Sequence, residues 1–231
     1  MADAYFVTGT DTGVGKTLVA AALLLAAGAR GARTIGLKPI ASGAAATPAG
    51  LRNEDALALL AAMNRELPYD EVNPVVLAPA VAPHIALAAG GLALDVAALH
   101  ARCLPALARP HDFAVVEGAG GWRVPLNHAE TLAGLARRLG FPVVLVVGLR
   151  LGCINHALLT AEAIRADGLE LAGWVANHVD PDMSCPAENL ATLDAMLGAP
   201  RLGVIPWRAG IDARAAAGLL DIDRLCRGAR D

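Results

Sequence analysis

The stretch Thr8-Gly9-Thr10-Asp11-Thr12-Gly13-Val14-Gly15-Lys16-Thr17 decides the fold that the sequence predicts. An apolar run, Tyr5-Phe6-Val7, precedes it, and a run rich in alanine and leucine, 18–27, follows it. This order predicts a strand, a glycine-rich loop and a helix. In such a loop the backbone N–H groups converge on phosphate oxygens, the helix adds the positive end of its dipole, and the lysine adds a mobile cation.

The loop departs from the usual phosphate-binding pattern in its spacing. That pattern has four residues between its first glycine and Gly-Lys-Ser/Thr, whereas residues 10–14 separate Gly9 from Gly15. The alternative is a glycine-rich turn with an incidental lysine, but the flanking segments favour phosphate binding. We therefore expect a nucleoside triphosphate here, with the hydroxyl of Thr17 as a ligand of a Mg²⁺ ion that bridges the phosphates.

Composition narrows the class of protein. The 231 residues carry a net charge of −3 without a basic block, which argues against nucleic-acid binding. No apolar run approaches the roughly 18 residues of a membrane span and no signal peptide precedes the first strand, so we expect a cytoplasmic protein without a membrane partner. The four cysteines, Cys103, Cys153, Cys185 and Cys226, form no C-x-x-C pair, and we expect reduced thiols.

Short apolar segments alternate with helical segments along the chain. We expect strands at 34–37, 73–77, 113–117, 142–147, 171–176 and 201–205. We expect helices at about 53–63, 83–90, 95–107, 131–139, 155–167 and 187–197, and a loop at 40–52, which is rich in Ala, Gly, Ser and Pro. This alternation predicts one α/β domain over residues 1–231, with a doubly wound, mostly parallel sheet and helices on both faces. The tail after Arg208 carries no clear pattern.

Several charged residues follow predicted strands, and ligands of such sheets bind at the carboxyl ends of the strands. Glu117 ends an apolar strand, at the place where proteins with this loop keep the acid that holds Mg²⁺ directly or through water. Its alternative is a capping or solvated carboxylate. Asp55 is a second candidate acid, although an aspartate in the first turn of a helix is common. Lys38 is either solvated or lies over the γ-phosphate, where it would stabilise charge during phosphoryl transfer.

A set of segments, in the same order along the chain, resembles the dethiobiotin synthetases, a family with this kind of loop. They are 9–17 with its extra residue, Lys38-Pro39-Ile40-Ala41-Ser42-Gly43, Asn73-Pro74, Pro83-His84, Glu117-Gly118-Ala119-Gly120-Gly121-Trp122, Leu151-Gly152-Cys153-Ile154-Asn155-His156, Gly173-Trp174-Val175-Ala176-Asn177 and Ile205-Pro206-Trp207. The resemblance extends from Tyr5 to about Trp207.

The resemblance implies an ATP-dependent ring closure in biotin synthesis. The family joins CO₂, supplied as bicarbonate, to the two adjacent amines of 7,8-diaminononanoate, forming the cyclic urea of dethiobiotin and releasing ADP and phosphate. One amine captures CO₂ as a carbamate, phosphorylation converts the carbamate to a carbamic-phosphoric anhydride, and the second amine attacks its carbon. Positioning and electrostatics are expected to dominate such catalysis.

The resemblance also implies roles for individual residues. Lys16 and Lys38 are the expected catalytic residues, and Thr17, Asp55 and Glu117 the expected Mg²⁺ ligands. Thr12 and Ser42 are expected to contact the diamine or carbamate. The expected nucleotide-binding residues are Gly13, Val14, Gly15, Lys16, Thr17, Leu18, Asp55, Glu117, Gly118, Ala119, Gly120, Asn177, His178, Pro206, Trp207 and Arg208.

By the same resemblance the protein is a homodimer whose active site lies at the subunit interface. The far carboxylate of the substrate is expected to bind the partner's helix start, formed by Gly152, Cys153, Ile154 and Asn155, because a helix N-terminus attracts anions. Two positions depart from the family. Gly13 stands where some members carry a glutamate, and Asn189 replaces a tyrosine associated with carboxylate binding.

Three alternatives bear on this interpretation. A nucleotide switch of the partitioning-ATPase type would carry a second lysine at the position of Asp11. Another amide- or urea-forming synthetase would not need the segments at 38–42 and 151–156. The tetrapeptide Asn177-His178-Val179-Asp180 has the spacing of the Asn-Lys-x-Asp turn that reads guanine, but Pro181 after Asp180 favours a solvated turn. We therefore expect ATP, with the role of Asp180 left open.

Overall fold

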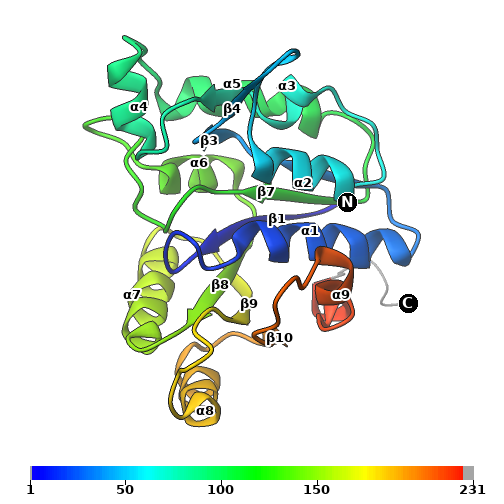
Figure 1. The fold of residues 1–231 in the computed structure, drawn as a ribbon, viewed down its shortest axis with the longest axis vertical. Coiled ribbons are helices and arrows are strands. Elements are labelled where there is room, and N and C mark those ends of the chain that lie inside the picture. The colour runs from blue at the N-terminus through cyan, green and yellow to red at the C-terminus, as the bar shows by residue number, and fades with distance from the viewer. Residues whose placement is uncertain (1, 226–231) are drawn as a thin grey trace.

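A six-stranded parallel sheet lies at the centre of the protein (Figure 1). The computed structural model describes residues 2–225. The strands of this sheet are β1 (Asp3–Gly9), β2 (Thr34–Leu37), β7 (Phe113–Glu117), β8 (Val143–Leu149), β9 (Leu171–His178) and β10 (Arg201–Ile205). They lie in the order β10-β9-β8-β1-β7-β2, and every neighbouring pair is parallel.

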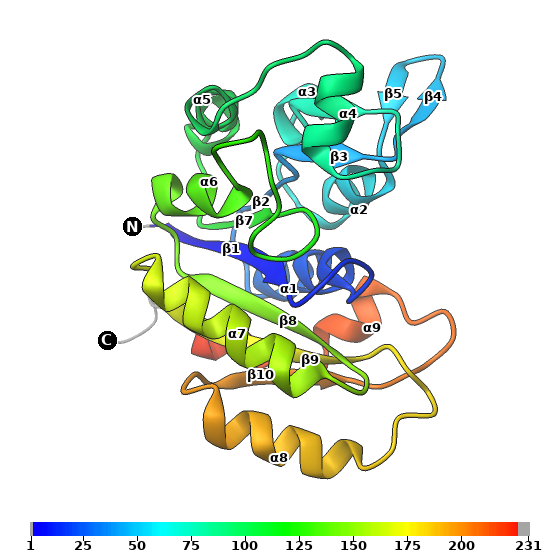
Figure 2. The same cartoon turned by 90° about the vertical axis from the view of Figure 1, so that its left-hand side faces the viewer.

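Helices cover both faces of the sheet, as the alternating pattern predicts (Figure 2). One face carries α1 (Lys16–Ala29), α2 (Glu54–Ala62) and α9 (Ala213–Ala217). The other carries α5 (Val96–Leu107), α6 (Leu132–Leu139) and α7 (Cys153–Ala166), with α8 (Pro186–Met196) packed beside α7. The predicted doubly wound α/β fold is confirmed. Because both faces are covered, the central strands β7 and β8 are buried along their whole length.

The prediction of a loop at 40–52 is wrong. This stretch holds three short strands, β3 (Ile40–Ser42), β4 (Ala45–Thr47) and β5 (Gly50–Arg52). β4 and β5 form an exposed antiparallel hairpin, and β3 pairs in parallel with β6 (Val75–Leu77) outside the central sheet. The strand expected at 73–77 therefore exists but belongs to a separate two-stranded sheet. Strands of three residues rich in alanine carry almost no sequence signal, because alanine and glycine have low strand propensity.

The expected long helices are present with boundaries close to those predicted. Asn53 caps α2, since its side chain accepts from the N–H groups of Asp55 and Ala56, and Asp95 caps α5 in the same way. Besides β3, β4 and β5, the sequence did not indicate α3 (Tyr69–Val72), α9 or the 3₁₀ turn η1 (Ile222–Arg224). Within residues 209–225 the tail thus carries α9, which packs on α1, and the carbonyl of Leu225 accepts a hydrogen bond from the hydroxyl of Tyr5.

The described cysteines are free thiols, as expected. Cys103 and Cys153 are buried and Cys185 is exposed, whereas Cys226 lies outside the described residues. Burial raises the pKa of the Cys103 thiol to about 12, which leaves it protonated and unreactive. Among residues 2–225, no helix combines the length and the apolar character that a membrane crossing requires.

The turn that carries Lys38 between β2 and β3 is held by the side chain of Asn73. Its Nδ2 donates to the carbonyl of Lys38 at 2.6 Å and to that of Val75 at 3.2 Å, and its Oδ1 accepts from the hydroxyl of Tyr69 at 3.0 Å. Asn73 is buried, and its two bonds to the carbonyls form away from water. The backbone of Lys38 is thereby fixed at both its N–H, which donates to the carbonyl of Val72, and its carbonyl.

We expect Asn73→Ala to lower the free energy of unfolding by about 1–3 kcal/mol, because it removes the side-chain donor of the Lys38 and Val75 carbonyls and the acceptor of the Tyr69 hydroxyl. Chemical denaturation followed by circular dichroism measures this change. The matched control is Asn155→Ala, at an exposed position, which should change the free energy by less than about 0.5 kcal/mol. Equal effects of the two substitutions would contradict a structural role for the Asn73 side chain.

Candidate functional site

A cleft of about 680 Å³ opens at the carboxyl ends of β1, β2 and β7. The charged groups that line it are Lys16, Lys38, Asp55 and Glu117. Its other lining residues are Thr12, Gly13, Gly15, Thr17, Ala41, Ser42, Ala80, Val81, Ala82, Pro83, Ala119, Gly120 and Val124. A larger cavity of about 900 Å³ lies beside α4 (Pro83–Ala89) and the start of α5, but its walls are mainly apolar. The smaller cleft is therefore the candidate site for charged ligands.

The glycine-rich loop between β1 and α1 forms one wall of the cleft. Gly13 and Gly15 have φ values of 74° and 89°. A residue with a side chain would be strained in this left-handed conformation. A Cβ at Gly15 would also lie 2.3 Å from Nδ2 of Asn177. That same Nδ2 donates to the carbonyl of Val14 at 2.9 Å, so Asn177 at the end of β9 supports the loop. The loop conformation is consequently fixed by a neighbouring strand.

Lys16 is buried at the start of α1 and reaches back over the loop. Its Nζ donates to the carbonyl of Asp11 at 2.9 Å. Burial and the charge of nearby Lys38 lower the pKa of Lys16 to about 8, against the smaller opposing effects of Glu117, Asp55 and Asp11. The ammonium of Lys16 therefore holds its proton less firmly than that of an ordinary lysine.

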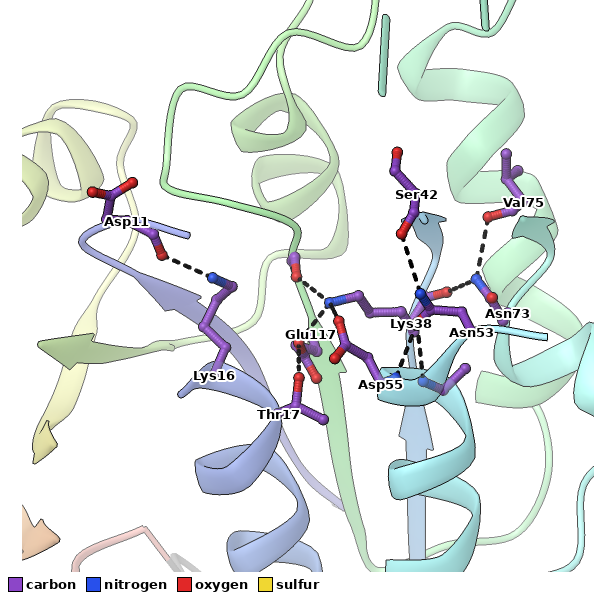
Figure 3. A network of polar contacts seen from close by, with 12 residues as sticks. Asp11, Lys16, Thr17, Lys38, Ser42, Asn53, Asp55, Asn73, Val75 and Glu117 are labelled. Carbon is purple, nitrogen blue, oxygen red and sulfur yellow. Dashed lines mark hydrogen bonds and ion pairs between the residues drawn. The ribbon is translucent and has the colours of Figure 1, made fainter. Parts of the chain in front are cut away.

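Lys38 joins two carboxylates at the floor of the cleft (Figure 3). Its Nζ lies 2.5 Å from Oε1 of Glu117 and 2.8 Å from Oδ2 of Asp55, and it donates to the carbonyl of Gly118 at 3.0 Å. Burial alone would lower the pKa of Lys38, but the two carboxylates outweigh it and the pKa is raised. For Asp55 burial would raise the pKa, and the charge and hydrogen bond of Lys38 hold it below the ordinary value. Both partners are thus charged at neutral pH.

The groups that the sequence assigns to Mg²⁺ converge beside this ion pair. The hydroxyl of Thr17 donates to Oε1 of Glu117 at 2.9 Å, and Oε2 of the same carboxylate is buried without a hydrogen-bond partner. These oxygens fit a hard divalent cation, which in phosphate sites uses one or two carboxylates together with the phosphates. Within residues 2–225 no group of three or more His, Cys, Asp or Glu side chains is arranged to hold a metal by itself.

The other residues expected near the phosphates have different surroundings. Thr12 and Ser42 line the cleft with Gly120 and Ala119, and Oγ of Ser42 is buried without a partner. Leu18 packs partly buried against the core. The structure thus brings Thr12 and Ser42 to the same cavity as Lys38.

The residues expected at the base lie farther along the sheet edge and do not line this cleft. Asn177 pairs in register with Ile205, so the ends of β9 and β10 place His178 near Pro206, Trp207 and Arg208. Trp207 is 56% exposed. Asp180 accepts from the N–H of Asp182 at 3.0 Å, which is the geometry of a local Asx turn. This contact supports the interpretation of Asp180 as a turn residue.

The expected carboxylate receptor at the start of α7 is separate from the cleft within one chain. Gly152 precedes the helix with a φ of 92°, Cys153 is buried, Ile154 is half-buried and Asn155 is exposed. Asn189 of α8 lies at this helix start, where its Oδ1 accepts from the thiol of Cys153. None of the receptor residues lines the cleft that holds Lys38.

Sequence reasoning missed the ion pair between Asp11 and Arg150. The carboxylate of Asp11 accepts from the N–H of Thr12 at 2.7 Å and pairs with the guanidinium of Arg150, which follows β8. The pair could have been predicted from the strand order. β1 and β8 are neighbours in the sheet, and the loops that follow neighbouring parallel strands lie side by side. The pair joins the glycine-rich loop to the segment that begins α7.

Comparison with known proteins places the chain among enzymes. The AAA domain family matches residues 3–215. The chain is 56% identical to the ATP-dependent dethiobiotin synthetase BioD of Marinobacter nauticus, over 90% of this chain and 89% of that protein. It is 58% identical to the BioD of Pseudomonas paraeruginosa, over 95% and 96% of the two chains.

Solved structures resemble the fold at lower identity. The septum site-determining protein MinD from Pyrococcus horikoshii, complexed with Mg-ADP, has a TM-score of 0.60 at 18% identity and covers 97% of this chain and 89% of that chain. The signal recognition particle receptor FtsY from Elizabethkingia anophelis, in complex with GDP, has a TM-score of 0.56 at 15% identity. The match covers 93% of this chain and 59% of that chain. These likenesses concern the fold alone.

The lowered pKa of Lys16 predicts how ATP affinity depends on pH. Below about pH 8 the amine is protonated and attracts the triphosphate, whereas above it binding must first restore the proton, so the affinity falls by up to about tenfold per pH unit. Calorimetric titration with MgATP between about pH 7 and pH 9.5 measures this. Lys16→Arg keeps its charge across that range and should show a flat profile. An identical slope in both proteins would assign the titration to another group.

Proposed function

The chain belongs to the dethiobiotin synthetase family and is therefore an ATP-dependent ligase of biotin biosynthesis, and from that premise we propose how its residues perform the reaction. The substrates are 7,8-diaminononanoate, CO₂ or bicarbonate, and ATP. The observation that carries the proposal is the gathering of Lys38, Asp55, Glu117 and Thr17 beside the glycine-rich loop in one cleft. This arrangement suits phosphoryl transfer to an anionic acceptor.

The nucleotide lies across the sheet edge in this proposal. The N–H groups of residues 13–18 and the ammonium of Lys16 bind the phosphates, while residues 118–120 border them on the other side. Asn177 and the turn from Pro206 to Arg208 receive the base, since β9 and β10 end side by side. An asparagine side chain matches adenine, because it offers both a donor and an acceptor.

Thr17, Asp55 and Glu117 hold Mg²⁺ in the proposed complex. The unpartnered Oε2 of Glu117 supports this assignment, because a fully buried carboxylate oxygen requires a donor or a cation. When bound, Mg²⁺ neutralises negative charge on the phosphates. The chain itself contributes the carboxylates and the hydroxyl that fix its position.

Three chemical steps follow from the substrate's functional groups. One amine of the diamine attacks CO₂, loses a proton and becomes a carbamate. A carbamate oxygen attacks the γ-phosphorus of ATP, the bond to ADP breaks, and a carbamic-phosphoric anhydride forms. The second amine then attacks the carbamate carbon, loses a proton and expels phosphate, which closes the cyclic urea. Each step begins with reactants that the site must hold close together.

Two lysines and two hydroxyl side chains in the cleft stabilise and orient the reactants in these steps. Lys38 faces the carbamate and the transferring phosphoryl group, and Lys16 faces the γ-phosphate, so that both neutralise charge that develops in the transfer. Thr12 and Ser42 hydrogen-bond the diamine or carbamate end. The buried, unpaired Oγ of Ser42 in the wall of the cleft supports this role.

A homodimer completes the proposed site. The α7 start, which receives the far carboxylate in this proposal, does not line the cleft of its own chain, and we assign it to the partner's cleft. Asn189, beside Cys153, replaces a tyrosine of other family members and offers an amide near the same helix start. Each active site then consists of the cleft of one subunit and the α7 start of the other.

A direct test of the reaction is the release of ADP on addition of diaminononanoate and bicarbonate. We expect release only when both are present, whereas ADP formation independent of the diamine would contradict the proposal. Lys16→Ala and Lys38→Ala should each lower kcat by about 10²–10³. Lys16→Ala should also weaken ATP binding, while Lys38→Ala should lower kcat more than it lowers ATP affinity. Near-normal turnover of Lys38→Ala would refute its role.

The shared site predicts complementation between two inactive variants. Lys38→Ala disables the cleft, and Asn155→Glu places a carboxylate at the α7 start, where it repels the substrate's carboxylate. Mixing and reassembling the two proteins should restore about a quarter of wild-type activity, because half of the dimers then contain one intact composite site. A mixture as inactive as its components, or a fully active monomer in sedimentation at nanomolar concentration, would reject the shared site.

A further inference from the structure

The ammonium of Lys38 has no donor left for a substrate in this structure. A lysine ammonium carries three N–H donors, and Lys38 has three oxygen partners, on Glu117, Asp55 and Gly118, within 3.0 Å. The side chain is only 4% exposed. A group that must face a carbamate and a phosphate is therefore saturated by the protein's own oxygens (Figure 3).

Two of these three partners are the carboxylates assigned to Mg²⁺. Oε1 of Glu117 binds the ammonium at 2.5 Å and also accepts from Thr17, and Oδ2 of Asp55 binds the ammonium at 2.8 Å. A divalent cation held by the same carboxylates would lie within a few ångströms of the ammonium. Two like charges at that distance in a buried site repel strongly, so the two cations exclude one another.

The geometry allows the ammonium to leave while the backbone stays in place. The N–H and carbonyl of Lys38 are fixed by Val72 and Asn73, so only the flexible side chain needs to turn. Lys38 lines the same cleft as Lys16 and Ser42, where the phosphates and the carbamate are expected. A rotated side chain would exchange its carboxylate partners for those of the ligand.

We propose that the two carboxylates form a single cation site with alternating occupants: the ammonium of Lys38 in the nucleotide-free protein and the divalent metal in the nucleotide complex. The proposal rests on the metal ligands given under the proposed function. Arrival of the metal with ATP displaces the ammonium and frees its three donors for the phosphoryl group and the carbamate. Without nucleotide the metal binds weakly, because the displaced ammonium of Lys38 then has no phosphate or carbamate to pair with.

This exchange makes the metal and the triphosphate bind cooperatively. Each of them improves the site for the other, since the metal replaces the ammonium on the carboxylates and the phosphates receive the ammonium. It also keeps the buried carboxylate of Glu117 paired in both states. Lys38 is consequently positioned for catalysis only when the metal–nucleotide complex is present.

The test measures binding of Mn²⁺ alone, without nucleotide, by electron paramagnetic resonance of the free ion. We expect Lys38→Met to bind Mn²⁺ at least about tenfold more tightly than the wild type, because no ammonium competes for the carboxylates. The matched control is Lys16→Met, which removes an equal charge that contacts the carbonyl of Asp11 instead. Its gain in Mn²⁺ affinity should be clearly smaller than that of Lys38→Met, because Lys16 acts on the carboxylates through its charge and not by direct contact.

Thermal unfolding gives a second readout. Lys38→Met leaves Glu117 and Asp55 without their cation, so its melting temperature should fall and Mg²⁺ alone should restore it. The wild type should respond little to Mg²⁺ alone. If Lys38→Met does not fold without metal, Lys38→Ala replaces it in the same assays. The smaller alanine side chain leaves space for water molecules that hydrate the two carboxylates.

The outcomes separate this proposal from the proposed function. The proposed exchange is refuted if Lys38→Met and the wild type bind Mn²⁺ with equal affinity. It is also refuted if Lys16→Met gains as much Mn²⁺ affinity as Lys38→Met. Binding of Mn²⁺ to the wild type in the presence of a non-hydrolysable ATP analogue tests the metal ligands separately, and Asp55→Asn should abolish it. If Asp55→Asn binds Mn²⁺ with the analogue as the wild type does, the metal assignment fails, and the exchange with it.

Discussion

The fully buried carboxylate of Glu117 is the constraint on which the site depends. A buried anion is tolerated only when cations and hydrogen-bond donors surround it. Glu117 receives these from two other elements, because Thr17 begins α1 and Lys38 follows β2. Asp55 of α2 then shares the same ammonium. One buried charge thereby joins three segments that the sheet brings to its carboxyl edge, and the phosphate loop lies directly beside them.

Much of this architecture could be predicted from the sequence, because the central strands are buried on both faces and read as continuous apolar runs. The segment that became β8 is such a run, and Glu117 marks the end of another. The short strands β3, β4 and β5 could not be predicted in the same way. Their residues are mostly small, and β3 depends on its pairing with β6, and β4 and β5 on their pairing with each other, rather than on a local pattern.

The identities of the candidate site residues could also be predicted, but their mutual contacts could not. The sequence indicated Lys38, Asp55 and Glu117 separately, each at the end of a strand or the start of a helix. Their convergence follows from the strand order, in which β7 lies between β1 and β2 although it comes much later in the chain. The pair of Asp11 and Arg150 was missed for the same reason, since it depends on β8 lying beside β1 on the other side.

The fold by itself does not distinguish a ligase from other nucleotide-binding proteins, because MinD and FtsY share this sheet at 18% and 15% identity. The residues around the phosphate loop bear more directly on the activity of this chain. Asp11 pairs with Arg150 of the same chain, so the start of the loop is tied to the segment before α7. On the opposite side, the turn from β2 into β3 places Lys38 and Ser42 in the same cleft as the loop residues. A protein that only hydrolyses or senses a nucleotide needs no binding site for an acceptor. A ligase does, because its acceptor must be bound next to the γ-phosphate and kept from competition with water.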